Sequence, residues 1–219
     1  MSLELDRRQL LRLAAAAAAA WQLAPWSLDS FAAPTDVHVG LVDSTLEAFA
    51  DTMIPGAKRF PTDRSVAGAA RGPGAVHAGA LDLLYFSPLG IAPALPAFAA
   101  AINAKAIAYA AEHQLLLDPT VAPFVALGFA DRTRLAVQLL DYSQPDYLLF
   151  YAVAALAFLA FHTAGHLHTA DAVRHGHPGL KAIGFPRPDA DGLWRYPHYS
   201  YRRAMAAPHP GTTATGNPA

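Results

Sequence analysis

The chain has 219 residues, of which 53% are hydrophobic and 15% charged, and its formal net charge is -1. This length and apolar content suit one compact domain with a sizeable core, and the near-neutral charge argues against a nucleic-acid partner, which would favour a basic face. The chain has no cysteine, which excludes disulfides, thiolate metal sites, CxxCH haem attachment and a cysteine nucleophile. Charged residues are scarcer than in most soluble domains, so we expect another molecule to cover part of the exterior.

Residues 1–32 are predicted to be an export signal. Arg7 and Arg8 precede a polar residue, two leucines and Arg12, and an unbroken alanine run follows. This pattern resembles a twin-arginine signal, whose mild apolar segment is too short to anchor a protein in a membrane. Small residues predict cleavage after Ala32, and export predicts a periplasmic or cell-surface location. The alternative is an ordinary amphipathic N-terminal helix with two incidental arginines.

The rest of the chain, grouped as a domain over residues 33–205, is predicted to be all-α. Apolar side chains recur at helical spacing, and no stretch shows the sustained alternation with β-branched residues that is typical of strands. Asp131 is a suitable N-cap for the helix that follows it. The predicted helices cover residues 39–54, 75–85, 95–117, a short piece around Phe124, 132–142 and 147–161.

The helix predicted over residues 147–161 contains no charge, glycine or proline. A helix that is apolar all round is buried in a protein core or in lipid. Its apolar run ends at His162, short of the roughly 18–20 residues that a bilayer crossing needs. We therefore expect a buried central helix that the other helices wrap. The alternative is a membrane protein anchored by residues 146–161.

Two acidic or glycine-rich patterns have a structural and a functional interpretation. Asp43, Glu47 and Asp51 recur every four residues on the first helix, which predicts a solvated or partner-facing stripe; a metal site is the alternative. Residues 72–77 resemble a dinucleotide-binding loop, but they lack its third glycine and no strand precedes them. We expect these glycines to allow a tight turn into a helix.

Histidines cluster where the central helix ends. His162 and His166 share a helix face, and His168 follows two residues later. Two imidazoles four residues apart can bind zinc or haem iron, with Asp171 as a further ligand to a non-haem metal. Histidines near a helix C-terminus also bond its last carbonyls. We predict structural or interface histidines; a metal or haem site and general acid–base catalysis remain alternatives.

From Thr169 onward the chain is punctuated by proline and glycine, and we expect an irregular segment. Its aromatic and arginine side chains are typical of an interface. The predicted interface residues are Phe185, Trp194, Tyr196, Tyr199, Tyr201 and Arg202. Residues 206–219 are polar and are predicted to be a disordered tail.

Several of these features occur together: the twin-arginine start, residues 46–56 (LEAFADTMIPG), the glycine–proline loop at 72–75, and the segments 184–186 and 199–202. Together they resemble the gluconate 2-dehydrogenase subunit 3 family, the small subunits of membrane-associated flavin dehydrogenases, over most of residues 40–205. The resemblance implies that this chain has no catalytic residues and no cofactor of its own. FAD is expected in a large partner subunit of the glucose-methanol-choline type, and a cytochrome subunit often collects the electrons.

The resemblance therefore predicts an accessory subunit that assists maturation of the flavoprotein and carries it through the twin-arginine translocase. The rival hypothesis is a small exported enzyme or electron carrier with a metal or haem at His162, His166 and His168.

Overall fold

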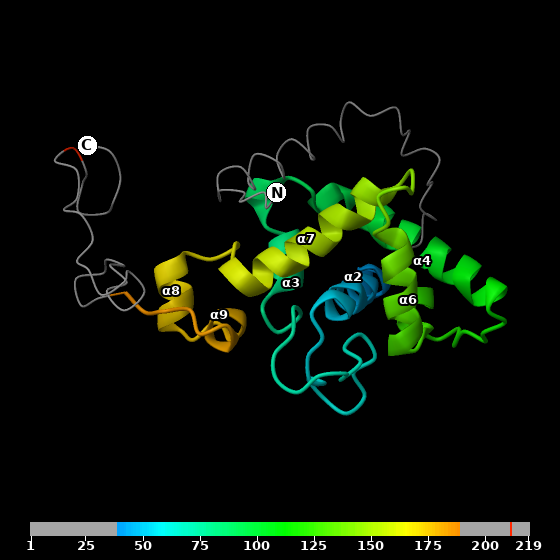
Figure 1. The fold of residues 1–219 in the computed structure, drawn as a ribbon, viewed down its shortest axis with the longest axis horizontal. Helices are drawn as coiled ribbons and strands as arrows, with labels where there is room; N and C mark the ends of the chain where they lie inside the picture. The colour runs from blue at the N-terminus through cyan, green and yellow to red at the C-terminus, as the bar shows by residue number, and fades with distance from the viewer. Residues whose placement is uncertain (1–38, 189–210, 212–219) are drawn as a thin grey trace.

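The computed structural model describes residues 39–188 and Gly211 (Figure 1). Every regular element in this part of the chain is helical, which confirms the all-α prediction. The helices are α2 (Val39–Met53), α3 (Ala80–Leu84), α4 (Leu95–Glu112), α5 (Pro123–Ala126), α6 (Phe129–Leu139), α7 (Tyr147–Thr163), α8 (Thr169–Arg174) and α9 (Pro178–Ala182). Two 3₁₀ turns, η2 (Ser87–Leu89) and η3 (Ala92–Ala94), lie between α3 and α4.

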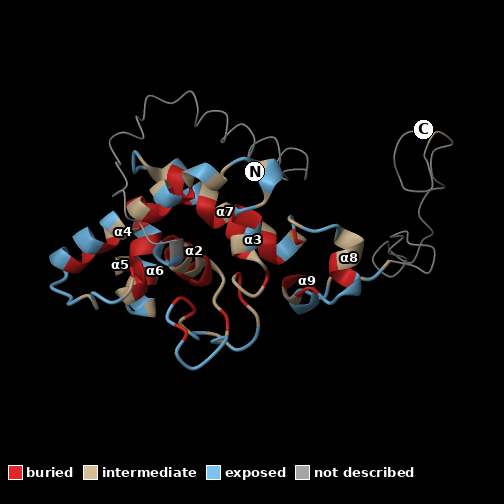
Figure 2. Ribbon diagram, turned by 180° about the vertical axis from the view of Figure 1, so that it is seen from behind, coloured by how far each residue is buried: buried red, intermediate tan, exposed pale blue. Residues whose placement is uncertain are grey.

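Helix α2 is the most enclosed element of the described fold. It packs against α3, α4, α5, α6 and α7, and Leu46 and Phe49 on its inner face are completely buried. Asn103 of α4 adds a polar link, because its amide donates to the Thr45 hydroxyl and its carbonyl accepts from the backbone N–H of Phe124. Figure 2 shows the buried residues gathered where α2, α3 and α7 meet.

Helix α7 is covered on one side only. Its inner face, which includes Phe150 and Val153, packs on α2 and α3, but Leu148, Tyr151 and Phe158 are 59%, 49% and 45% exposed. The expectation that other helices wrap α7 all round therefore does not hold for its outer face. The composition of α7 gives no signal of this difference, since both faces are apolar.

One described helical stretch, Ala92–Glu112, is long and apolar enough to cross a membrane by length and composition, and 44% of its window lies buried inside the fold. Core helices of soluble proteins pass the same test. Helix α7, the stretch for which the membrane-anchor alternative was considered, is shorter than such a span.

Two predicted helices are shorter in the structure because a residue adopts left-handed backbone geometry. The helix expected over residues 75–85 is regular only from Ala80. Gly79 has φ 77°, which interrupts the helical hydrogen-bond pattern before that residue. Helix α4 ends at Glu112 rather than at residue 117, because Gln114 has φ 54°. A left-handed residue cannot continue a right-handed helix.

Two further expectations need correction. Asp131 is not an N-cap: α6 begins at Phe129, and the Asp131 carboxylate accepts bonds from Tyr109 and Arg134 instead. The segment after Thr169 is not irregular throughout, because it forms α8 and α9 over a small core of its own. That core contains Ala164, Ala172, Val173 and Leu180, with Phe185 packed against it.

Candidate functional site

The three clustered histidines have different environments. His162 is exposed on α7 and its Nδ1 lies 3.0 Å from the carbonyl oxygen of Phe158. His168 is exposed, with its Nδ1 3.8 Å from an Asp171 oxygen. His166 points instead toward the turn before α3, where its ring would contact a Cβ placed on Gly79. No group of three His, Asp or Glu side chains that could hold a metal occurs among residues 39–188.

His177, which the sequence analysis did not select, has a structural role that the geometry defines. Its Nδ1 accepts from the backbone N–H of Leu180 and so caps α9. Its Nε2 lies 3.0 Å from the carbonyl oxygen of Ala78, 99 residues away in sequence. Because Nδ1 must be an acceptor, Nε2 carries the proton and donates. One imidazole thus joins α9 to the turn that leads into α3.

His166 makes the stability of the fold sensitive to pH. Burial lowers its pKa, with Asp82 opposing and neighbouring His177 adding to the shift. The unfolded chain therefore binds this proton at a higher pH than the folded chain does. The free energy of unfolding is unaffected by His166 above about pH 6.5 and falls as the pH drops below that value. We expect His166→Gln to reduce the loss of unfolding free energy between about pH 7.5 and pH 5.5, measured by urea titration. The exposed His162→Gln is the control, and an equal slope for both variants would contradict this assignment.

The two glycine–proline motifs lie side by side in the structure. The backbone N–H of Ala57 donates to the Gly72 carbonyl at 2.8 Å, and the N–H of Ala75 donates to the Ile54 carbonyl at 2.9 Å. Gly56 and Gly74 lie against each other where these two segments meet, and neither position has room for a side chain. The glycines at 72 and 74 therefore form a tight turn, and the loop between the motifs closes onto the end of α2.

Two of the acidic residues of α2, Glu47 and Asp51, are not free to form the solvated or partner-facing stripe that their spacing predicts. Asp51 is 1% exposed, and its two carboxylate oxygens accept from the N–H groups of Gly56 and Ala67. Burial raises the pKa of Asp51, and these two bonds act in the opposite direction. Both carboxylate oxygens of Glu47 accept hydrogen bonds from the guanidinium of Arg59, which makes a bidentate ion pair. The loop after α2 folds back over this face, a long-range arrangement that helical spacing does not encode.

Arg132 fastens the same loop from the other side. Its guanidinium is buried within α6 at 3% exposure and donates to four backbone carbonyls. The acceptors are the carbonyl oxygens of Arg64, Ser65, Val125 and Leu127. Burial lowers the pKa of Arg132 to about 10, and the charge of Asp51 opposes this shift.

Arg59 and Asp63 complete the scaffold inside the loop. The guanidinium of Arg59 bonds to Asp63 at 2.7 Å while also pairing with Glu47. Asp63 also accepts from the N–H of Val66, which tightens the turn. The bonds from Arg59 and Val66 hold the pKa of Asp63 below its ordinary value despite burial. The buried carboxylates of this region are thus all committed to holding backbone.

Among the exposed residues of this loop are Lys58, Phe60, Arg64 and Arg71, which together we call the loop surface. Phe60 is 52% exposed, unusual for a large aromatic side chain on a well-fixed loop. Arg64 pairs with Asp118 at 3.1 Å. Within the part of the chain that the structure describes, no hydrogen bond or ion pair involves the side chains of Lys58 or Arg71. The loop surface is therefore aromatic and basic.

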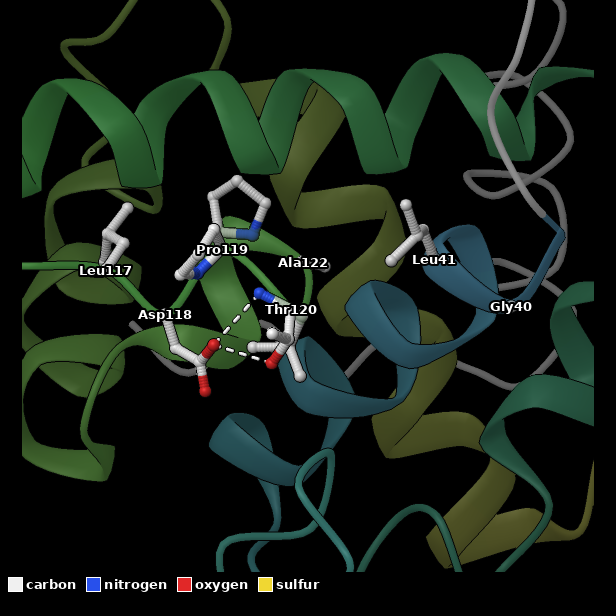
Figure 3. A pocket seen from close by; sticks show the side chains of 9 residues that line it. Gly40, Leu41, Leu117, Asp118, Pro119, Thr120 and Ala122 are labelled. Atoms are coloured by element: carbon white, nitrogen blue, oxygen red, sulfur yellow. Dashed lines mark hydrogen bonds between the residues drawn. The ribbon is translucent and has the colours of Figure 1, made fainter.

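A hollow beside the start of α2 offers no reactive group. It encloses about 680 Å³ and is mostly apolar (Figure 3). Asp118 contributes a carboxylate, but Thr120 donates to it through both its hydroxyl and its backbone N–H. Those bonds and Arg64 keep the pKa of Asp118 below its ordinary value, which suits an ionised turn residue rather than an acid catalyst. The hollow is lined by Gly40, Leu41, Leu117, Asp118, Pro119, Thr120, Val121, Ala122 and Pro123.

Several predicted residues lie outside the described part of the chain. These are the export arginines Arg7 and Arg8 with the cleavage position at Ala32, and the interface residues Trp194, Tyr196, Tyr199, Tyr201 and Arg202. Phe185 is described and is partly buried against the small core under α8 and α9. Arg59, Asp63 and Arg132 were not predicted from the sequence as residues of a site. A signal for Arg132 exists, since it precedes Leu135 and Leu139 by three and seven residues on the inner face of α6.

The model of a family of unknown function (DUF5987) matches residues 40–219. No curated protein matches the chain significantly. No solved structure does so either.

Proposed function

The chain belongs to the family of unknown function DUF5987, and we propose that it is the non-catalytic small subunit of a flavin dehydrogenase complex. In this proposal it binds a large subunit of the glucose-methanol-choline type that has no export signal. It then carries that folded partner through the twin-arginine translocase to the periplasm or cell surface. FAD belongs to the large subunit, and a cytochrome subunit can join the complex there.

The observation that supports the proposal is that the buried charged side chains hold a surface loop in place. Removing charged groups from water is costly, and a protein tolerates it when the charges are paired and hydrogen-bonded. Here the buried side chains of Asp51, Asp63 and Arg132 form hydrogen bonds that fix a surface loop, and none of them is left free as a reactive group. A loop held rigid by a scaffold is a common carrier of binding residues.

The chemistry of the loop surface supports a protein partner. Aromatic and arginine side chains are enriched at protein interfaces and supply much of their binding energy. Phe60 offers an apolar anchor, and Lys58 and Arg71 give the same loop positive charge. The expected partner face is therefore an apolar pocket with an acidic rim on the large subunit. The residues of the two motifs that resemble subunit 3 proteins, 46–56 and 72–75, form the base of this surface.

One co-expression experiment tests both parts of the proposal. The chain is produced with the flavin dehydrogenase encoded beside it, and exported FAD and dehydrogenase activity are measured. Replacing Arg7 and Arg8 with lysine is expected to retain both proteins in the cytoplasm as an intact complex, lowering exported activity at least tenfold. Phe60→Asp is expected to leave export of this chain intact while the flavoprotein stays behind.

Two control variants accompany these changes. Arg174→Lys at an exposed position of α8 matches the arginine replacements, and Val137→Asp at an exposed position of α6 matches the new charge at Phe60. Both are expected to export the flavoprotein normally. Export of an active flavoprotein in the absence of this chain would overturn the proposed function. Normal co-export with Phe60→Asp would overturn only the assignment of the loop surface.

A further inference from the structure

Residues 164–185, which we call the α8–α9 lobe, pack around a core of their own. Figures 1 and 2 show α8 and α9 beyond the end of α7, to one side of α2, α4 and α6. The chain enters the lobe at Ala164, whose backbone is left-handed with φ 49° and ends α7. The buried members of the lobe's core are Ala164, Ala172, Val173 and Leu180, with Phe185 packed against them. Because this core is separate from the main one, the lobe can move as a unit while the main core stays intact.

Helix α9 attaches the lobe to the rest of the fold. Gly179 lies against the carbonyl oxygen of Phe161, where a Cβ would have no room. The Nε2 of His177 donates to the Ala78 carbonyl at 3.0 Å, and its Nδ1 accepts from the backbone N–H of Leu180. His177 is 7% exposed, so these bonds are shielded from water. Both nitrogens of one buried, neutral imidazole therefore hold the start of α9 and join it to the turn before α3.

The attachment requires His177 to be neutral. A proton on Nδ1 would turn the acceptor into a donor that faces the N–H of Leu180, so the cap bond could not form. It would also place a charge in a buried position, where the ring of His166 lies 6.1 Å away between centroids. An open lobe, in contrast, exposes the imidazole to water and lets it take up the proton. Acid therefore favours the open form at His177.

His166 acts in the same direction. Its Nδ1 is buried and has no hydrogen-bond partner among residues 39–188. Burial lowers the pKa of this imidazole, the charge of Asp82 opposes the shift, and His177 adds to it. The closed lobe thus disfavours the proton on His166, whereas the open lobe lets the ring bind it as an ordinary histidine does. A drop in pH below about 6.5 therefore favours opening at both rings.

The titratable groups on the body side of the pair leave this direction unchanged. Asp82 of α3 is the carboxylate that favours a proton on His166, and its side chain is exposed. His77, in the turn before α3, accepts from the N–H of Gly74 at 3.2 Å. Protonation of His77 would break that bond, which lies within the turn and not between the turn and the lobe. His162 of α7 is exposed.

The charged groups on the lobe itself are exposed or paired. Arg174 of α8 forms an ion pair with Asp171 at 3.0 Å, and the Nδ1 of His168 lies 3.8 Å from the same carboxylate. His175 and Lys181 are exposed. A proton taken up by His175 or His168 stays in water whether the lobe is closed or open, so it does not drive the opening.

We propose that acid releases the α8–α9 lobe from the turn before α3 while the main core stays folded, with His166 and His177 taking up the protons. Each proton changes the opening equilibrium by up to about tenfold per pH unit. The release makes this end of the molecule respond to the acidity of the compartment that the protein occupies. The inference goes beyond the proposed function and does not depend on it.

Amide hydrogen exchange of the purified full-length chain, followed by NMR at about pH 7.5 and pH 5.5 with exchange times scaled for the intrinsic effect of pH, tests the release. The N–H groups of Leu180 and Lys181 bond to the side chain and the carbonyl of His177. We expect their protection to fall by about tenfold at the lower pH, while the amides of α2 and α4 keep theirs. Unchanged protection at Leu180 overturns the proposal, and so does an equal loss in α2 and α4, which would mean unfolding of the whole chain.

Histidine variants assign the release to the two rings. The double variant His166→Gln with His177→Asn, in which Asn keeps an acceptor for the N–H of Leu180, is expected to give equal protection at both pH values. His77→Gln and the exposed His175→Gln are the controls, and both are expected to retain the tenfold loss. A double variant that retains the loss, or a control that abolishes it, overturns the assignment.

A single variant covers the case in which the double variant does not fold, as judged by circular dichroism. His166→Gln keeps both hydrogen bonds of His177 and removes one of the two proton sites. We expect a smaller loss of protection at Leu180 than in the natural chain, and an unchanged loss overturns the role of His166.

Discussion

Arg132→Met is expected to lower the free energy of unfolding by about 3–5 kcal/mol, the usual cost of removing one partner from a buried charged network. The replacement keeps the apolar volume of the side chain but removes its donors from four backbone carbonyls. It also removes the cation that offsets the buried charge of Asp51. Domains of this kind are stable by roughly 5–15 kcal/mol, so the loss takes away a large share. Urea unfolding followed by circular dichroism measures it.

Two neighbouring variants make this experiment specific. Arg134→Met, two residues along α6, removes an exposed arginine that pairs with Asp131, and we expect stability close to that of the natural chain. Arg132→Lys keeps the charge but not the planar fork that reaches several carbonyls at once, so its stability should fall between the two. The variants should also differ in proteolysis at residues 58–72. Equal stability of Arg132→Met and Arg134→Met would refute a clamp at Arg132.

Gly74→Ala is expected to cost roughly 2–3 kcal/mol, the upper part of the range for overpacking. A methyl group there would lie 2.6 Å from the Gly56 nitrogen and 2.7 Å from the Pro55 carbonyl carbon. These are backbone atoms, so no flexible side chain can move aside. The expected consequence is separation of the two glycine–proline motifs. Amide exchange should then become faster at Ala57 and Ala75, whose N–H groups bond across the contact.

Gly40→Ala is the matched control for this glycine replacement. A methyl group at Gly40 would meet nothing within 4 Å, and the residue lies in α2, where alanine is a better helix former than glycine. We expect unchanged stability or a gain of about 0.5 kcal/mol. If both glycine variants unfold at the same urea concentration, the close contact at Gly74 does not contribute to stability.

The helices were predictable from the sequence wherever local pattern decides the structure. The apolar positions of α2 recur at helical spacing, and Pro55-Gly56 ends it at the expected place. The ends of α3 and α4 were less predictable, because the left-handed geometry of Gly79 and Gln114 depends on what packs around them. Glutamine, the residue at Gln114, is not a type that routinely adopts left-handed geometry.

The acidic residues of α2 show where local pattern fails. Asp43, Glu47 and Asp51 have the same spacing as a solvated stripe, and nothing within the helix distinguishes them. Only the return of residues 57–70 over that face buries Asp51 and pairs Glu47 with Arg59. Burial of Arg132 also depends on this loop. Its guanidinium can lie on the inner face of α6 because the loop carbonyls of Arg64 and Ser65 accept its hydrogen bonds.

The sequence by itself determined an all-α chain, a charge-free helix at residues 147–161, the turns at its glycine–proline motifs and the absence of any cysteine chemistry. The tertiary structure decided which face of α7 stays exposed, which carboxylates are buried and which histidine joins distant segments. The physical reason is the range of the interactions. Helical periodicity and turn geometry act between residues a few positions apart, whereas burial and ion pairing depend on segments that only the complete fold brings together.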